Sequence, residues 1–233
     1  MPINIILFFI SIFCVSSASL IALKLGKQAL IGLICVQTLL VNLFVCKEIT
    51  LFGFSATASD SLAVGITLSF NLLQEYYGKL EAQKTIWVSF FCSLFYIIMG
   101  LLHLSYIPAP QDSSSEHFEA LLSPMPRVVA ASLVVFILAQ NLDTLLYGFL
   151  SNRFKTRFFI LRNYGSVAIT QLVDTVLFSF LGLYKLNGHF MHLSTIFEII
   201  IISYTIKLIV IAVATPFLAL SKKLYISKET TYL

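Results

Sequence analysis

Residues 127–150 read RVVAASLVVFILAQNLDTLLYGFL, and this stretch sets the class of the protein. An α-helix crosses the hydrocarbon core of a bilayer with about 20 residues, so the stretch is long enough to span a membrane. After Arg127 its one charged residue is Asp143, which stands three residues beyond Gln140. Ionisable residues inside membrane helices are costly and are kept for function or for pairing. The stretch therefore predicts a transmembrane helix that carries a polar site.

The rest of the chain follows the same pattern. Of its 233 residues, 58% are hydrophobic and 11% are charged, whereas about a quarter of a soluble domain is charged. Seven apolar runs are long enough to span a bilayer: 3–23, 28–46, 57–77, 86–106, 127–150, 163–184 and 196–220. The third is the least apolar, and prolines predict a loop over 107–126. We expect an all-α, polytopic transmembrane bundle of about seven helices, with the lipid bilayer as its partner and no separate soluble domain.

The basic residues predict the orientation of these helices. With the N-terminus outside, the inner segments carry 11 of them and the outer segments carry 3, namely Lys47, Arg127 and Lys185. Loops that stay in the cytoplasm are enriched in lysine and arginine. The N-terminus is therefore expected outside and the C-terminus inside. Because the basic residues lie in loops beside the membrane, the net charge of +4 does not indicate a nucleic-acid partner.

A short motif occurs twice. Residues 140–147 and 171–178 both fit Q-x-x-D-T-x-L-aromatic, and they lie on expected helices that run in opposite directions. Inverted repeats are typical of transporters, whose substrate sites lie between the repeats. The motif is consistent with an inverted repeat, and a chance match over eight positions is the alternative.

Polar residues within the apolar runs form the set of candidate site residues. We expect substrate contacts from this set: Asn42, Asn71, Glu75, Arg127, Gln140, Asp143, Arg162, Gln171, Asp174 and Lys207. Asp174 and Lys207 each stand 11 residues from the start of their runs, so both are expected near the midplane, where an ion pair between them is geometrically possible. A purely structural pair is the alternative to a ligand or proton site. Glu198 stands near an outer end and is expected to be solvated.

Four segments resemble the queuosine-precursor transporter family, also called the vitamin uptake transporter (VUT) family. They are N-L-L-Q-E-Y-Y-G-K-L-E-A-Q-K-T-I-W (71–87), R-V-V-A-A-S-L-V-V-F-I-L-A-Q-N-L-D-T (127–144), L-R-N-Y-G-S-V-A-I-T-Q-L-V-D-T-V-L-F (161–178) and Y-T-I-K (204–207). The resemblance covers about 30–220. It departs from the family pattern at Asn71, where an acid is usual.

The resemblance also suggests how the chain is divided. Residues 1–27 are expected to form an extra N-terminal transmembrane helix, 28–221 a six-helix transporter core and 222–233 a cytoplasmic tail. The alternative for the first run is a cleaved signal peptide, although residues 1–4 lack the positive charge of such a segment.

The resemblance implies import of a 7-deazaguanine, such as the cyano or aminomethyl base or queuine, across the cell inner membrane for tRNA modification. Such a nucleobase-like ligand offers an N1–H and an amine side by side, which a carboxylate can accept together. Asp143 or Asp174, each with the glutamine three residues before it, is expected to bind this edge. Tyr164, Phe178 or Phe136 could stack on the ring, although plain packing is the usual role of aromatic residues at helical spacing.

Three other functions are alternatives to transport by this chain alone. The first is a substrate-capture subunit for another vitamin-like molecule that needs an ATP-driven partner. The second is an intramembrane enzyme, but the sequence has no Ser-His, Cys-His or metal-binding pattern and no nucleotide or cofactor motif. The third is a structural scaffold, which the intramembrane charges argue against. We therefore expect a transporter without catalytic residues, metal or cofactor.

Overall fold

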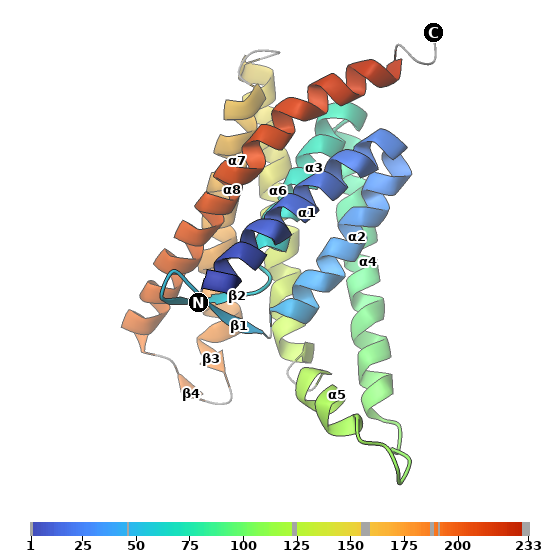
Figure 1. Ribbon diagram of the computed structural model, residues 1–233, viewed down its shortest axis with the longest axis vertical. Coiled ribbons are helices and arrows are strands. Elements are labelled where there is room, and N and C mark those ends of the chain that lie inside the picture. The colour runs from blue at the N-terminus through green and yellow to red at the C-terminus, as the bar shows by residue number, and fades with distance from the viewer. Residues whose placement is uncertain are drawn as a thin grey trace.

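The computed structural model describes residues 2–45, 47–122, 125–154, 159–186, 189–190 and 192–229. Within them are seven long helices: α1 (Pro2–Leu25), α2 (Lys27–Phe44), α3 (Asp60–Tyr77), α4 (Lys79–Leu104), α6 (Met125–Phe154), α7 (Phe159–Phe178) and α8 (Leu193–Glu229). These helices pack side by side as one bundle (Figure 1). Six of them, all except α3, are long and apolar enough to cross a membrane. The expectation of an all-α polytopic bundle is confirmed.

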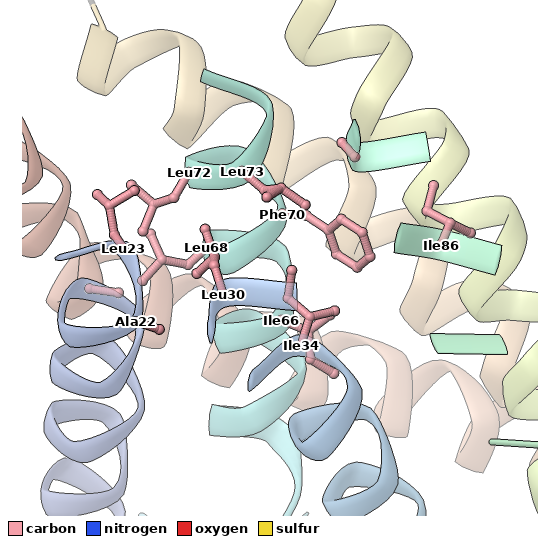
Figure 2. Packing of buried hydrophobic residues seen from close by; sticks show 12 residues of the cluster. Ala22, Leu23, Leu30, Ile34, Ile66, Leu68, Phe70, Leu72, Leu73 and Ile86 are labelled. Atoms are coloured by element: carbon pink, nitrogen blue, oxygen red, sulfur yellow. The ribbon is translucent and has the colours of Figure 1, made fainter. Parts of the chain in front are cut away.

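The exception, α3, is the best-buried helix of the bundle. Fourteen of its 18 residues are buried, because α1, α2, α4, α6, α7 and α8 all pack against it. Its apolar side chains form the main core cluster with Leu23 of α1, Leu30 of α2 and Ile86 of α4 (Figure 2). A helix surrounded by other helices need not be apolar all round, because it does not face lipid. This explains why the third apolar run is the least hydrophobic.

Small residues bring α1 and α3 together. Ser11 hydrogen-bonds Ser61 at 2.7 Å and Ser19 hydrogen-bonds Ser69 at 2.8 Å, so the two helices are parallel and keep one register over two turns. Between these pairs, a Cβ added to Gly65 would lie only 2.0 Å from Val15 Cγ1. Small residues at four-residue spacing are a common means of close helix approach in membranes. Thus α1 is an integral part of the packed bundle.

The helix boundaries differ from those expected, most of all around α3 and at α8, which runs to Glu229 although its helix was expected to end at 220 and a tail to begin at 222. We expected helices over 57–77 and 86–106, but α4 already begins at Lys79, and Gly78 alone separates it from α3. Gly78 has a φ of 92°, a left-handed conformation that favours glycine and lets the chain reverse in one residue. The third helix begins at Asp60 rather than at 57, because the hairpin of β1 (Glu48–Leu51) and β2 (Phe54–Thr57) precedes it.

The segment 107–126 contains a short helix, α5 (Ser115–Leu122), where only a loop was expected. Asp112 accepts hydrogen bonds from the backbone and the hydroxyl of Ser114 just before this helix. Such bonds satisfy donors where a helix starts. These bonds also hold the pKa of Asp112 at about 2, below its usual value. Near the other end of the chain, a π-helical turn, η1 (Ser179–Leu183), continues α7 towards a small hairpin of β3 (Lys185–Leu186) and β4 (His189–Phe190).

Candidate functional site

A pocket lies inside the bundle between five helices. It is lined by α2 (Val41, Val45), the segment before α3 (Thr57, Ser59), α3 (Asp60, Ala63, Ile66), α6 (Ser132, Val135, Phe136, Gln140), α7 and η1 (Gln171, Asp174, Thr175, Phe178, Ser179) and α8 (Ile199, Ser203, Lys207). The space between these residues, counted together with its part open to solvent, is about 860 Å³. A concave site with a mostly apolar lining and a few converging polar side chains is the usual form of a small-molecule site.

An ion pair forms part of the pocket wall. Lys207 Nζ of α8 donates to Asp174 Oδ2 of α7 at 2.7 Å, so the ion pair that their similar depth made possible is present. The lysine side chain is 7% exposed, while that of the aspartate is 25% exposed. A buried charge needs a partner because the interior solvates it poorly. Asp174 satisfies Lys207 and still presents part of its carboxylate to the pocket.

Within the described part of the chain, three buried oxygen atoms of pocket-lining residues lack hydrogen-bond partners. They are Asp60 Oδ2 of α3, Gln140 Oε1 of α6 and Gln171 Oε1 of α7, and each of these residues is at most 5% exposed. The amide of Gln171 is oriented by its own donor, which bonds Thr67 Oγ1 at 3.0 Å. Buried polar atoms are nearly always paired, so unpaired ones need an explanation. Because the three residues line one pocket, the donors of a ligand bound there would be natural partners for these acceptors.

Asp143, the first acid of the repeated motif, is not among the residues that line the pocket. It is 1% exposed, and its Oδ1 accepts hydrogen bonds from Ser166 at 2.5 Å and Thr170 at 3.3 Å. Both donors belong to α7, so Asp143 ties α6 to α7. The two aspartates of the repeat thus have different environments: one bridges helices and the other faces the pocket.

Glu75 lies far from the pocket. It stands 15 residues after Asp60 on α3, which is about 22 Å along the helix axis. Tyr147 of α6 donates to Glu75 Oε2 at 2.6 Å, and the neighbouring Gln74 donates to the carbonyl oxygen of Thr144 at 3.2 Å. These bonds hold α3 against α6 at the opposite end of α3 from Asp60.

The remaining expected site residues fall into two groups. Asn42 and Asn71 are buried and do not line the pocket, although Asn42 Oδ1 and both polar side-chain atoms of Asn71 lack partners. The side chains of Arg127 and Arg162 lie outside the described part of the chain. The structure therefore brings together Gln140, Gln171, Asp174 and Lys207 in one pocket.

Two of the three candidate aromatic residues reach the pocket. Phe136 of α6 and Phe178 of α7 line it, while Tyr164 packs against an apolar cluster shared by several helices, which includes Ile206 and Val210 of α8. Phe178 is the last residue before the π-helical turn η1, and such turns are frequent at functional sites. Glu198 is exposed, as expected.

Sequence reasoning missed Asp60. It is the first residue of α3 and is 5% exposed. Its carboxylate interacts electrostatically with Lys207 and Asp174. Its position near the start of an apolar run is typical of an interfacial residue, so it did not stand out. The feature that could have identified Asp60 from the sequence is an acidic residue near the start of the least apolar run.

Comparison with known proteins bears on this pocket. Residues 61–221 match a family model described as "Putative vitamin uptake transporter". The chain is also 34% identical over 210 residues to a protein of Bacillus subtilis (strain 168) named "Probable queuosine precursor transporter", with 88% of each chain covered. No solved structure matches the chain. The family match spans the pocket-lining parts of α6, α7 and α8, and it begins one residue after Asp60.

Proposed function

The chain belongs to the vitamin uptake transporter family, and on that basis we propose that it imports a queuosine precursor, a 7-deazaguanine base, for tRNA modification. It is a transporter rather than an enzyme, and a multi-pass membrane protein, in bacteria of the inner membrane. We further propose that the pocket between α2, α3, α6, α7 and α8 is where the base binds.

One observation carries this proposal: Asp60, Gln140 and Gln171, whose side chains hold unpaired acceptors, all line a single pocket. A guanine-type base is rich in donors, with an N1–H, an exocyclic amine and a ring N–H. A ligand that leaves such buried acceptors unpaired binds weakly, so the pocket favours a donor-rich base over a donor-poor one.

The Lys207–Asp174 pair supplies the complementary pattern for the base edge. Guanine presents a carbonyl oxygen beside its N1–H, and the pair presents an ammonium donor beside a carboxylate acceptor. Lys207 would donate to the carbonyl oxygen, and Asp174 would accept from the N1–H and the amine. Adenine has an acceptor at N1 and would be rejected. Phe136 and Phe178 offer apolar faces for the flat ring.

Uptake into cells that lack their own carrier and cannot synthesise the precursor tests the proposal. With the chain expressed and a 7-deazaguanine supplied, queuosine should appear in tRNA, and Asp174→Asn should abolish it. Glu116→Gln, which changes an exposed acid of α5, is the matched control and should behave as the wild type. Absence of queuosine with well-expressed wild-type protein would refute import of this class of base.

Reconstitution separates the proposal from its alternative. The purified chain in liposomes should take up the base without any other protein. Uptake that requires an added ATP-driven partner would instead assign the chain as a substrate-capture subunit.

A further inference from the structure

The pocket contains more acidic than basic groups. Among its described lining residues three are charged, namely Asp60, Asp174 and Lys207. Lys207 is already engaged by Asp174 at 2.7 Å. Asp60 is 95% buried, and its Oδ2 has no hydrogen-bond partner, although Thr57 contacts the carboxylate. With all three ionised, the pocket lining carries one net negative charge that no described side chain neutralises.

Burial disfavours the charged form of Asp60, and two features of its position act against this effect. It is the first residue of α3, and a helix N-terminus stabilises a negative charge. Lys207 also attracts it electrostatically. An unpaired charge in a poorly hydrated interior is nevertheless costly, and a cation placed beside it relieves that cost. The second carboxylate of the pocket is thus an unused partner for a positive group.

We propose that Asp60 selects a ligand that carries a positive charge, so that the preferred substrate is a 7-deazaguanine with a protonated aminomethyl substituent rather than a neutral one. This inference rests on the proposed function of the same pocket. The Lys207–Asp174 pair binds the base edge, and Asp60, on the separate helix α3, accepts the ammonium group of the substituent. Charge-assisted hydrogen bonds of this kind are the strong ones in protein sites.

Binding to the purified protein tests the inference with two bases of nearly equal size. The aminomethyl and cyano 7-deazaguanines differ by a cationic against a neutral substituent of two heavy atoms. Wild-type protein should bind the aminomethyl base about ten- to a hundredfold more tightly. Asp60→Asn should remove most of this preference by weakening the aminomethyl base alone, with the affinity for the cyano base changed less than about threefold.

A matched control uses another acid near the pocket. Glu198 is exposed on α8, beside the pocket-lining Ile199, and Glu198→Gln removes the same formal charge. It should leave both affinities unchanged, because Glu198 is not among the residues that line the pocket. Equal effects of Glu198→Gln and Asp60→Asn would show that long-range charge, rather than contact with Asp60, sets the preference.

The outcomes distinguish the inference from the proposed function. If wild type binds both bases equally, or prefers the cyano base, the inference is overturned while the proposed function stands. If Asp60→Asn weakens both bases to the same extent, Asp60 does not recognise the substituent and the inference is overturned. If wild type binds neither base, the proposed function itself fails. The wild-type comparison decides the matter even where Asp60→Asn does not fold.

Discussion

Gly65→Ala is the substitution whose effect follows most directly from the packing. The added Cβ would lie 2.0 Å from Val15 Cγ1 and 3.4 Å from Val15 Cβ. Valine cannot easily turn away, because a β-branched side chain on a helix is nearly fixed at χ1. The clash must therefore move α1 away from α3 or strain both helices. Overpacking of this kind costs about 1–3 kcal/mol.

Helix propensity opposes this cost. Alanine in a helix is more favourable than glycine by about 1 kcal/mol. Because the 2.0 Å approach is severe, the overpacking cost is expected in the upper part of its range, about 2–3 kcal/mol. The net loss for Gly65→Ala is then about 1–2 kcal/mol, or a fall in Tm of about 2–8 °C for a chain of this size. Thermal unfolding of the purified protein in detergent measures it. Gly32→Ala is the control, because Gly32 is exposed on α2 with nothing within 4 Å of its added Cβ. That variant should be as stable as the wild type or slightly more stable.

A double-mutant cycle identifies the atom responsible. Val15→Ala removes Cγ1 and leaves the Val15 Cβ at an ordinary contact distance from the new methyl group of Ala at position 65. The two substitutions together should therefore destabilise the protein by at least 1 kcal/mol less than the sum of the singles (an order-of-magnitude value for contacting residues). Additive effects, or a Gly65→Ala protein as stable as the wild type, would refute the close approach of α1 to α3.

Three further predictions concern charge and topology. Removing one partner of the Asp174–Lys207 pair should lower the free energy of unfolding by about 3–5 kcal/mol. The double variant, Asp174→Asn with Lys207→Met, should restore folding and expression but not transport. The yield and the uptake activity of both single variants and of the double variant measure this. Asp143→Asn should lower thermal stability by about 1–3 kcal/mol and leave ligand affinity in the folded fraction unchanged, because its carboxylate bonds Ser166 and Thr170; a large loss of affinity would return Asp143 to the site. Reporters fused after Arg157 and after Lys223 should report the cytoplasm, and a reporter within 111–119 should report the outside. If the reporters within 111–119 and after Arg157 report the same side, the orientation predicted from the basic residues is wrong.

Apolar run lengths were enough to predict the helices, because a span of about 20 residues in lipid has one conformation that satisfies its backbone. They did not predict where the helices end, because contact with lipid does not determine the conformation there. Lys79 and Lys84 suggested a loop, yet Glu81 of the same turns pairs with Lys84 and with Lys27 of α2, so the charges lie on an ordered helix. The hairpin β1–β2 and helix α5 depend on local hydrogen bonds that hydropathy does not report.

Some side-chain contacts could be predicted from the sequence, and others could not. The Asp174–Lys207 pair was predictable because both residues stand at similar depth, and opposite charges inside a membrane seek each other. The repeated motif gave no means of separating Asp143 from Asp174, because the difference comes from Ser166 and Thr170 on one side and Lys207 on the other. Asp60 is recognised as a pocket residue only when α3 is packed against α8, which brings it near Lys207.

The two faces of α3 explain why the pocket is built around the helix that is least suited to lipid. One face carries Ser61, Gly65 and Ser69, which recur every four residues and contact α1. The other face carries Asp60, which lines the pocket, and Thr67 seven residues later, which bonds Gln171 of α7. Replacing the first face with larger apolar residues would make α3 a better membrane span but would push α1 away. Making the second face apolar would leave Lys207 and Gln171 with fewer polar neighbours. Because α1 and the other helices shield α3 from lipid, α3 can carry a buried acid into the centre of the bundle, where a donor-rich ligand can meet it.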